Sequence, residues 1–315
     1  MRILITGGLG YIGARLAKYL IKNTSNTIII GTRKNIDTID WLPKVKFVNT
    51  LWNSSKELEK ICQDVDIVIH SAGMNAMDCS AEPSLALEVN GIYTARILQA
   101  SINQKVKRFI YLSTAHVYSA PLEGKITERS ICKNLHPYAT SHKIGEDAVR
   151  FSNFKGEIDG IVVRLSNSFG PPENIQTNCW SLVANDLCKQ AVKHNNMILR
   201  SSKMQRRDFI SLSNVCRAIE HLITLPASQL KDGLFNIGGE WTPTILDVAK
   251  ILSKRINILT HKEVSIKFQK INPSSSISSL DFDIAKIKST GFELIEDKNN
   301  EFDKLVNFCL ENFGV

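Results

Sequence analysis

The chain lacks several features that would place it outside the class of ordinary globular proteins. Its 315 residues contain no apolar run near the roughly 20 residues that a membrane-spanning helix requires. The first apolar strand begins at residue 2, so we expect no signal or transit peptide before it. Internal repeats and long low-complexity tracts are also missing. The sequence therefore predicts a cytoplasmic globular protein without a membrane partner.

Cysteines and basic residues are present but are not grouped. The seven cysteines are odd in number, scattered and never spaced C-x-x-C, which argues against a disulfide framework and against a metal site. The net charge of +8 comes without a long basic run or a basic patch interleaved with aromatic residues, so nucleic acid is not an expected partner. A basic surface suits a small anionic ligand instead.

The chain opens with a short apolar strand that runs into a glycine-punctuated turn and a helix. Residues 2–6 form the expected strand, and glycines follow at three-residue spacing. Glycines at this spacing permit a tight turn, a close approach of backbone to a pyrophosphate and close packing of helix on strand. The helix then directs its free N–H groups at the phosphates. The pattern predicts dinucleotide binding through Gly7, Gly10, Tyr11, Ile12 and Gly13.

The end of the second expected strand bears on the choice of dinucleotide. Many NAD enzymes of this architecture carry an acidic residue there, whereas an arginine accommodates the 2′-phosphate of NADP. This chain has Thr32, Arg33 and Lys34 at that position and no acid. We expect Thr32 and Arg33 to contact the cofactor and favour NADP over NAD, with solvated loop charges as the alternative interpretation.

The turn TGGLGYIG resembles the short-chain dehydrogenase/reductase superfamily, in particular its extended branch of nucleotide-sugar epimerases, dehydratases and reductases. Residues 64–73, DVDIVIHSAG, are similar to the D-x-V-x-H-x-A-[AG] segment of that family, which passes under the cofactor. The resemblance implies cofactor contacts from Ser71, Ala72 and Gly73. We interpret His70 as a core histidine with satisfied hydrogen bonds and not as a base.

Two further segments resemble the catalytic motifs of the family. STAHVY (113–118) is similar to S-[ST]-x-x-V-Y-G, which implies that Thr114 hydrogen-bonds the reacting sugar oxygen. His116 is a predicted substrate contact, and Ala115-His116 replaces the Asp-Glu of the dehydratases. Tyr138 matches the tyrosine of Y-x-x-x-K, the acid/base, but His142 stands at the lysine position. Lys143 lies one residue late, on another face of the helix, because residues five apart diverge by about 140°.

The resemblance continues through the second half of the chain. RLSNSFGP (164–171) is similar to R-x-x-N-x-[YF]-G-P, and RRDFISLSNV (206–215) is similar to R-D-[FW]-[IV]-x-V-x-D-[VL]. It implies that Asn167 and Arg207 bind a sugar diphosphate, for which a planar arginine fork is suited. The competing interpretation of Arg207 is a surface ion pair with Asp208. Residues 272–279, rich in serine, are expected to be an exposed loop.

We therefore predict an α/β fold with a Rossmann-type, doubly wound parallel sheet in residues 1–166, and a smaller mixed α/β substrate domain in residues 167–315. Residues 234–237 are candidates for returning to the first domain. The expected function is NAD(P)-dependent hydride transfer at a nucleotide-activated sugar, at C4, in glycan precursor biosynthesis. In the family, helices corresponding to 83–102 and to the one after Tyr138 often form a dimer, which implies a homodimer.

Three functions remain open at this point. An epimerase would return the hydride to the opposite face of the sugar, whereas a 4-dehydrogenase or 4-ketosugar reductase would release the changed cofactor. A third candidate is a dinucleotide-binding sensor or scaffold with weakened catalysis, which His142 favours. Retention of Thr114, Tyr138, Asn167 and Arg207 argues against it.

Overall fold

The computed structural model describes residues 1–36, 38–42, 45–200, 202, 204–269 and 279–314. The chain divides into two compact units. The first comprises Met1–Ser119, Ile131–Leu165 and Ala218–Asn236, and the second comprises Ala120–Ser130, Ser166–Arg217 and Ile237–Val315. Compared with the division expected at residue 166, the first unit also contains a segment from the second half of the chain, and the second also contains residues 120–130.

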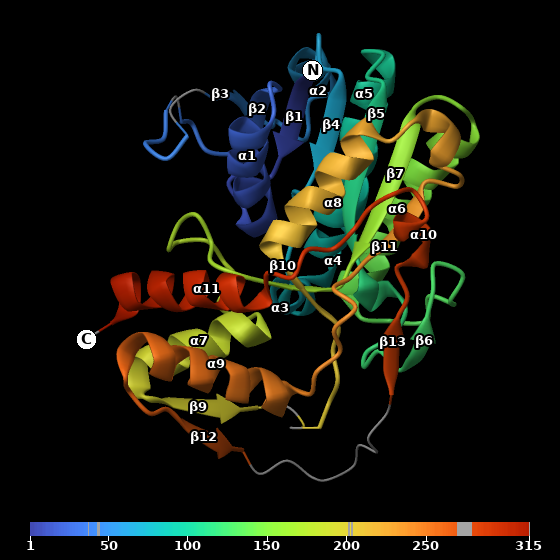
Figure 1. Ribbon diagram of the computed structural model, residues 1–315. Coiled ribbons are helices and arrows are strands. Elements are labelled where there is room, and N and C mark those ends of the chain that lie inside the picture. Colours follow the sequence, from blue (N-terminus) through green and yellow to red (C-terminus); the bar gives the residue numbers. More distant parts are fainter. Residues whose placement is uncertain (37, 43–44, 201, 203, 270–278, 315) are drawn as a thin grey trace. The chain divides into compact units, whose positions relative to one another are not determined.

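The first unit is built on a seven-stranded sheet with the order β3-β2-β1-β4-β5-β7-β11 (Figure 1). All pairings from β3 to β7 are parallel. The strands are β1 (Arg2–Thr6), β2 (Thr27–Thr32), β3 (Lys46–Asn49), β4 (Ile67–His70), β5 (Arg108–Thr114), β7 (Asp159–Leu165) and β11 (Leu234–Ile237). The order reverses between β1 and β4, which is the point where doubly wound sheets bind their ligands.

Helices cover both faces of this sheet, which explains why nearly all residues of its central strands are buried. On one face, α1 (Tyr11–Asn23) is joined to α8 (Leu212–Thr224) by a hydrogen bond of 2.6 Å from the Tyr19 hydroxyl to Glu220; both lie toward the viewer in Figure 1. On the other face, α5 (Tyr93–Asn103) packs against both α2 (Ser55–Cys62) and α6 (Pro137–Phe154).

The helix expected over residues 83–102 is not regular. It begins as α4 (Pro83–Ala86), widens into a π-helical segment, η1 (Leu87–Ile92), and continues as α5. Single-turn π segments inside α-helices are rare and occur often at functional sites. This one contains the fully buried Asn90. The hydrophobic spacing of the sequence predicts the helix but carries no signal for the wider turn.

The second unit has a core of its own and three short parallel strand pairs. The pairs are β8 (Asn167–Phe169) with β10 (Phe209–Ser211), β9 (Asn196–Leu199) with β12 (Ser265–Phe268), and β6 (Gly124–Ile126) with β13 (Leu280–Phe282). Its long helices are α7 (Val183–His194), α9 (Ile245–Thr260) and α11 (Lys298–Phe313). Of the expected loop 272–279, residues 272–278 lie outside the described residues.

Shorter elements complete the fold. They are α3 (Ala76–Ala81), the 3-10 helices η2 (Ala115–Val117) and η3 (Ala227–Gln229), and α10 (Ala285–Lys288). Among the residues that the structure describes, none of the helices has the length and apolarity needed to cross a bilayer.

Candidate active site

The glycine turn after β1 lies directly against the loop after β4. Gly7 has φ +69°, and a Cβ at this position would come within 2.5 Å of the Ala72 backbone nitrogen, so only glycine fits. The Ser71 hydroxyl donates a hydrogen bond of 2.8 Å to the carbonyl oxygen of Thr6. The predicted cofactor residues of β1, α1 and the β4 loop are therefore neighbours. Their close-packed backbone at the start of α1 fits a dinucleotide pyrophosphate.

The end of β2 presents the two other predicted cofactor residues. The Thr32 hydroxyl oxygen accepts a hydrogen bond of 3.1 Å from the Lys34 backbone N–H, and the Arg33 side chain is exposed. The strand end thus carries an exposed cation and a capped turn. Its geometry is compatible with both NAD and NADP.

Thr114 and Tyr138, the predicted catalytic pair, are brought together in the first unit. Thr114 is the last residue of β5, is buried, and accepts a hydrogen bond of 3.1 Å from the His116 backbone N–H. Burial raises the pKa of Tyr138, and a hydrogen bond with the Thr114 side chain opposes that rise. Tyr138 is the second residue of α6, where the His136 ring accepts a hydrogen bond of 3.1 Å from its backbone N–H. The predicted substrate contact His116 is half-buried in the turn that follows Thr114, and its carbonyl oxygen accepts a 2.7 Å hydrogen bond from the Asn134 side chain.

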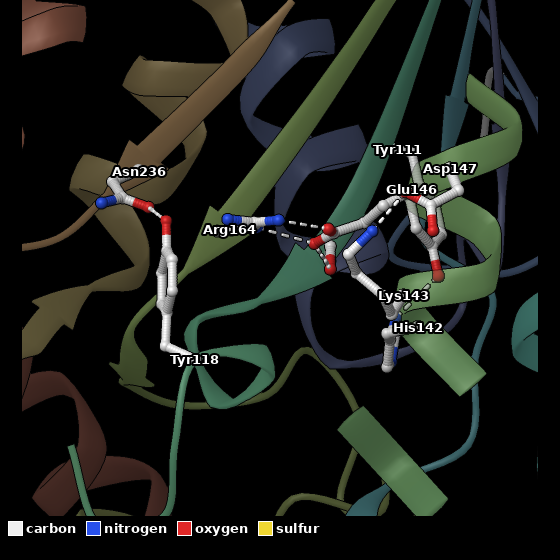
Figure 2. Close-up of polar contacts among 9 residues, drawn as sticks. Tyr111, Tyr118, His142, Lys143, Glu146, Asp147, Arg164 and Asn236 are labelled. Carbon is white, nitrogen blue, oxygen red and sulfur yellow. Dashed lines mark hydrogen bonds and ion pairs between the residues drawn. The ribbon is translucent and has the colours of Figure 1, made fainter. Parts of the chain in front are cut away.

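His142 lies one turn beyond Tyr138 on the same face of α6, as the four-residue spacing predicts. The two rings pack edge to face with centroids 4.7 Å apart. The Tyr111 hydroxyl of β5 lies 2.7 Å from Nδ1 of His142 (Figure 2). Burial lowers the pKa of His142 to about 4, so its imidazole is neutral at physiological pH. Lys143 turns to a different face and forms an ion pair with Asp147.

Asn90, to which the sequence assigned no role, joins the cofactor loop to the catalytic helix. Its side-chain oxygen accepts a hydrogen bond of 2.8 Å from the Met74 backbone N–H, and its side-chain nitrogen donates to the Ser141 hydroxyl at 3.0 Å. The π-helical turn of η1 positions this side chain. Asn90 and Tyr111 are thus two contributors to the site that the motifs did not indicate, because both look like ordinary members of buried elements.

His70 makes hydrogen bonds through both ring nitrogens inside the core. Its Nδ1 lies 2.6 Å from the Thr6 hydroxyl and its Nε2 lies 3.0 Å from the Thr94 hydroxyl. Burial lowers its pKa to about 3. These contacts agree with the interpretation of His70 as a satisfied core histidine.

A buried ion pair holds α6 against the sheet (Figure 2). Arg164 of β7 donates to both carboxylate oxygens of Glu146, from Nε at 3.0 Å and from Nη2 at 2.6 Å. The Ser113 hydroxyl donates to the same carboxylate at 2.6 Å, and the Tyr118 ring stacks against the guanidinium at 4.6 Å. The Tyr118 hydroxyl in turn donates to Asn236 at 2.6 Å. These contacts fix the position of α6 beside Thr114.

The second unit contains the other two predicted substrate residues. Asn167 begins β8, and its side-chain amide donates to the backbone carbonyl of Asp208 at 2.9 Å. This bond uses one of its two amide hydrogens. The Asp208 carboxylate is fully buried and accepts hydrogen bonds from the backbone N–H groups of Gly239 and Trp241 at 2.9 and 3.2 Å. Burial raises the pKa of Asp208 to about 6.

Arg207 is the cation of this region. Its guanidinium makes one long hydrogen bond, 3.4 Å, to the Gln205 side chain, and no ion pair to it is found among the residues that the structure describes. Burial lowers the pKa of Arg207. The surface pair with Asp208, the competing interpretation, is not formed, because the Asp208 carboxylate turns inward to backbone donors. Within the described part of the chain, Arg207 is therefore a partly desolvated cation without a carboxylate partner, which is the state expected of a residue that binds an anion.

Comparison with known proteins gives one family and consistent relatives. The model of the NAD dependent epimerase/dehydratase family matches residues 3–238. The dTDP-D-glucose 4,6-dehydratase of Dictyostelium discoideum is 31% identical over 284 residues, which cover 82% of this chain and 62% of that protein.

Two solved structures share the fold over nearly the whole chain. The UDP-N-acetylglucosamine 4-epimerase of Methanobrevibacter ruminantium superposes with a TM-score of 0.82 at 21% identity, covering 98% of each chain. The UDP-glucuronic acid 4-epimerase of Bacillus cereus, solved with NAD, gives 0.82 at 21% identity and covers 99% of this chain and 100% of its own. These similarities confirm the predicted α/β architecture.

Proposed function

Because the chain belongs to the NAD dependent epimerase/dehydratase family, we propose that it is a nucleotide-sugar 4-epimerase that uses a dinucleotide bound at the glycine turn. The observation that carries the proposal is the pairing of Thr114 with Tyr138 at the carboxyl end of β5. Parallel α/β sheets bind their ligands at this edge. A cytoplasmic location and a place in glycan precursor biosynthesis remain predictions.

Tyr138, Thr114 and His142 have different roles in the proposed reaction. Tyr138 takes the proton of the sugar C4 hydroxyl and later returns it, while Thr114 holds that oxygen in position. A bound nicotinamide supplies the hydride acceptor. His142, neutral and four residues beyond Tyr138, faces the same side of α6 and would meet the cofactor ribose. Because His142 brings no positive charge, the Tyr138 proton is lost less readily than beside a lysine.

Epimerisation is favoured over 4,6-dehydration by the residues after Thr114. The dehydratases that the motif resembles place Asp-Glu there, and this chain has the buried Ala115 and then His116. A methyl group cannot protonate a leaving hydroxyl, and elimination of water needs such an acid. A 4-dehydrogenase or 4-ketosugar reductase remains the second candidate, supported by Arg33 at the end of β2, which suits an exchangeable NADP. The names of the family and of a relative solved with its cofactor specify NAD, and NAD is the cofactor we propose.

The substrate we propose is a sugar joined to a nucleoside diphosphate. Arg207 supplies a partly buried cation that meets no carboxylate in the described ranges, and Asn167 retains amide hydrogen-bonding capacity in the same unit. Relatives with 4-epimerase names act on UDP-sugars, which makes UDP the first nucleotide to test.

A homodimer is also proposed. Three apolar side chains at helical spacing on α6 are exposed, namely Ile144, Phe151 and Phe154. On the neighbouring helical run, Leu85 and Ile92 are exposed as well. Such a set of large apolar side chains is typical of a surface covered by another subunit. Sedimentation analysis of wild type and of Phe151→Glu tests this, with a monomeric wild type contradicting the proposal.

The activity is tested by incubating the protein with UDP-glucose, UDP-N-acetylglucosamine and UDP-glucuronic acid in the presence of NAD. The proposal predicts an equilibrium mixture of C4 epimers, of unchanged mass, without net reduction of the cofactor. Tyr138→Phe should abolish the conversion because it removes the transferable proton. A product lighter by one water would establish dehydration instead, and accumulation of reduced cofactor would establish the dehydrogenase.

A further inference from the structure

The side chain of Tyr111 reaches α6 at the position where the family motif has its lysine. Tyr111 is a fully buried residue of β5, and Gly145 of α6 faces it. A Cβ on Gly145 would come within 2.8 Å of the Tyr111 hydroxyl oxygen. Because Gly145 has no side chain, the Tyr111 hydroxyl can pack against α6 beside His142 (Figure 2).

The Tyr111 hydroxyl has one proton to donate, and it lies near the His142 ring, the Asn90 carbonyl and the Thr94 hydroxyl. The hydroxyl oxygen lies 2.7 Å from Nδ1 of His142 and 3.2 Å from the backbone carbonyl oxygen of Asn90. Bonds donated by a hydroxyl are most often 2.7–2.8 Å and rarely exceed about 3.0 Å. The Asn90 carbonyl also accepts the Thr94 hydroxyl at 2.7 Å and does not need a second donor. The shorter of the two contacts therefore assigns the hydroxyl proton to Nδ1, in place of the longer bond from Tyr111 to the Asn90 carbonyl.

This assignment fixes the other nitrogen of the ring. A neutral imidazole carries one proton, so an Nδ1 that accepts a hydrogen bond requires the proton to be on Nε2. His142 is buried, and Nε2 makes no hydrogen bond within the part of the chain that the structure describes. The Cε1 atom between the two nitrogens lies 3.7 Å from the place of a Cβ on Gly73, in the loop assigned to the cofactor.

We propose that Tyr111 is a positioning residue that holds His142 as its Nε2–H tautomer, so that the neutral ring donates a hydrogen bond to the nicotinamide ribose of the bound dinucleotide. The inference rests on the proposed function for the identity of that acceptor. The neutral His142 ring takes over the hydrogen bond by which the family's lysine orients the ribose. It does not supply the positive charge of that lysine. Orientation of the cofactor and acidification of Tyr138, which one lysine combines, are thus separated in this chain.

The tautomer is measured directly on the protein labelled with ¹⁵N-histidine, without cofactor, by long-range ¹H–¹⁵N correlation spectra at pH 7. We expect His142 to show a protonated Nε2 and an unprotonated Nδ1. Tyr111→Phe keeps the ring and removes the hydroxyl, and should move the spectrum toward a mixture of tautomers. Tyr118→Phe is the matched control, because it removes the hydroxyl of another buried tyrosine that bonds to Asn236. A wild-type ring protonated on Nδ1 overturns the proposal.

A double-mutant cycle on NAD affinity, measured by calorimetry, separates positioning of His142 from general support of the fold. Loss of one neutral hydrogen bond corresponds to roughly 2- to 12-fold in affinity, which is the expected effect of Tyr111→Phe. In the background of His142→Lys, the same substitution should have no effect, since an ammonium group has no tautomer to select. An equal loss in both backgrounds overturns the positioning role. If wild type binds no NAD, both the proposed function and the contact of His142 with the ribose are wrong. The histidine spectrum still decides the tautomer of His142.

Discussion

The two units each contain a buried or half-buried arginine, and the surroundings of these residues differ. Arg164 of the first unit is 2% exposed and donates to both oxygens of Glu146, which raises its pKa. Arg207 of the second unit has no carboxylate partner among the residues that the structure describes, and burial lowers its pKa. An arginine whose donors are satisfied internally stabilises the fold, whereas a partly desolvated arginine that meets no carboxylate among the described residues is available to a ligand. Both arginines lie in sequence motifs, but the resemblance implies a ligand role only for Arg207 and names no partner for Arg164.

The largest expected effect is on stability and comes from breaking the ion pair between Arg164 and Glu146. Glu146→Ala leaves the Arg164 guanidinium buried without its carboxylate, and removal of one partner of a buried ion pair typically costs about 3–5 kcal/mol. We expect the free energy of unfolding, from urea titration, to fall by this amount. Arg207→Ala is the control and should leave stability unchanged or slightly increased. A Glu146→Ala protein as stable as wild type would show that the pair contributes little.

The second largest effect is expected in the pH dependence of stability, which compares a buried neutral histidine of the first unit with the buried charges above. The pKa of His142 is about 4 in the folded protein and near 6.5 when unfolded. The unfolded state therefore takes up the proton first, and stability present above pH 6.5 is lost as pH falls from 6.5 through 4. Between the two pKa values, the extra proton bound by the unfolded state changes the free energy of unfolding by about 1.4 kcal/mol per pH unit. His142→Gln should reduce the slope of unfolding free energy against pH in this window, and equal slopes would contradict the burial of a neutral ring.

Removing the Arg207 side chain should affect ligand binding and not folding. Charge-assisted hydrogen bonds contribute about 1.5–3 kcal/mol. Arg207→Ala should therefore weaken UDP binding, measured by calorimetry, by roughly tenfold or more. Arg206→Ala is a neighbouring control, because the Arg206 guanidinium is already used in a 2.8 Å hydrogen bond to the Thr242 carbonyl. If neither UDP, GDP nor TDP binds the wild-type protein, the proposed substrate class is wrong.

The smallest effect is expected at Lys143. Its ion pair with Asp147 lies at the surface, where such pairs contribute about 0–1 kcal/mol. Lys143→Ala should leave NAD affinity unaltered and change stability little. His142→Ala should weaken NAD binding, since it removes the residue on the same face as Tyr138. The reverse result, with only Lys143→Ala impairing NAD binding, would show that Lys143 is the ribose ligand.

Much of the first unit could be predicted from the sequence alone. The strand expected at residues 2–6 is confirmed as β1, and the helix expected to begin at Tyr11 is α1. These features depend on local spacing, apolar periodicity and glycine, all of which the sequence displays directly. The π-helical turn at Asn90 carries no such local signal.

The sequence by itself determined the family, the doubly wound sheet and the positions of Thr114, Tyr138 and His142 along their elements, because these follow from motifs within single segments. Only the tertiary structure decided what each side chain meets. It placed the Tyr111 hydroxyl beside His142 and paired Arg164 with Glu146. It also directed the Asp208 carboxylate to backbone N–H groups and not to Arg207. Partners of this kind can lie tens of residues apart, and burial, which sets their charge state, is a property of the packed chain.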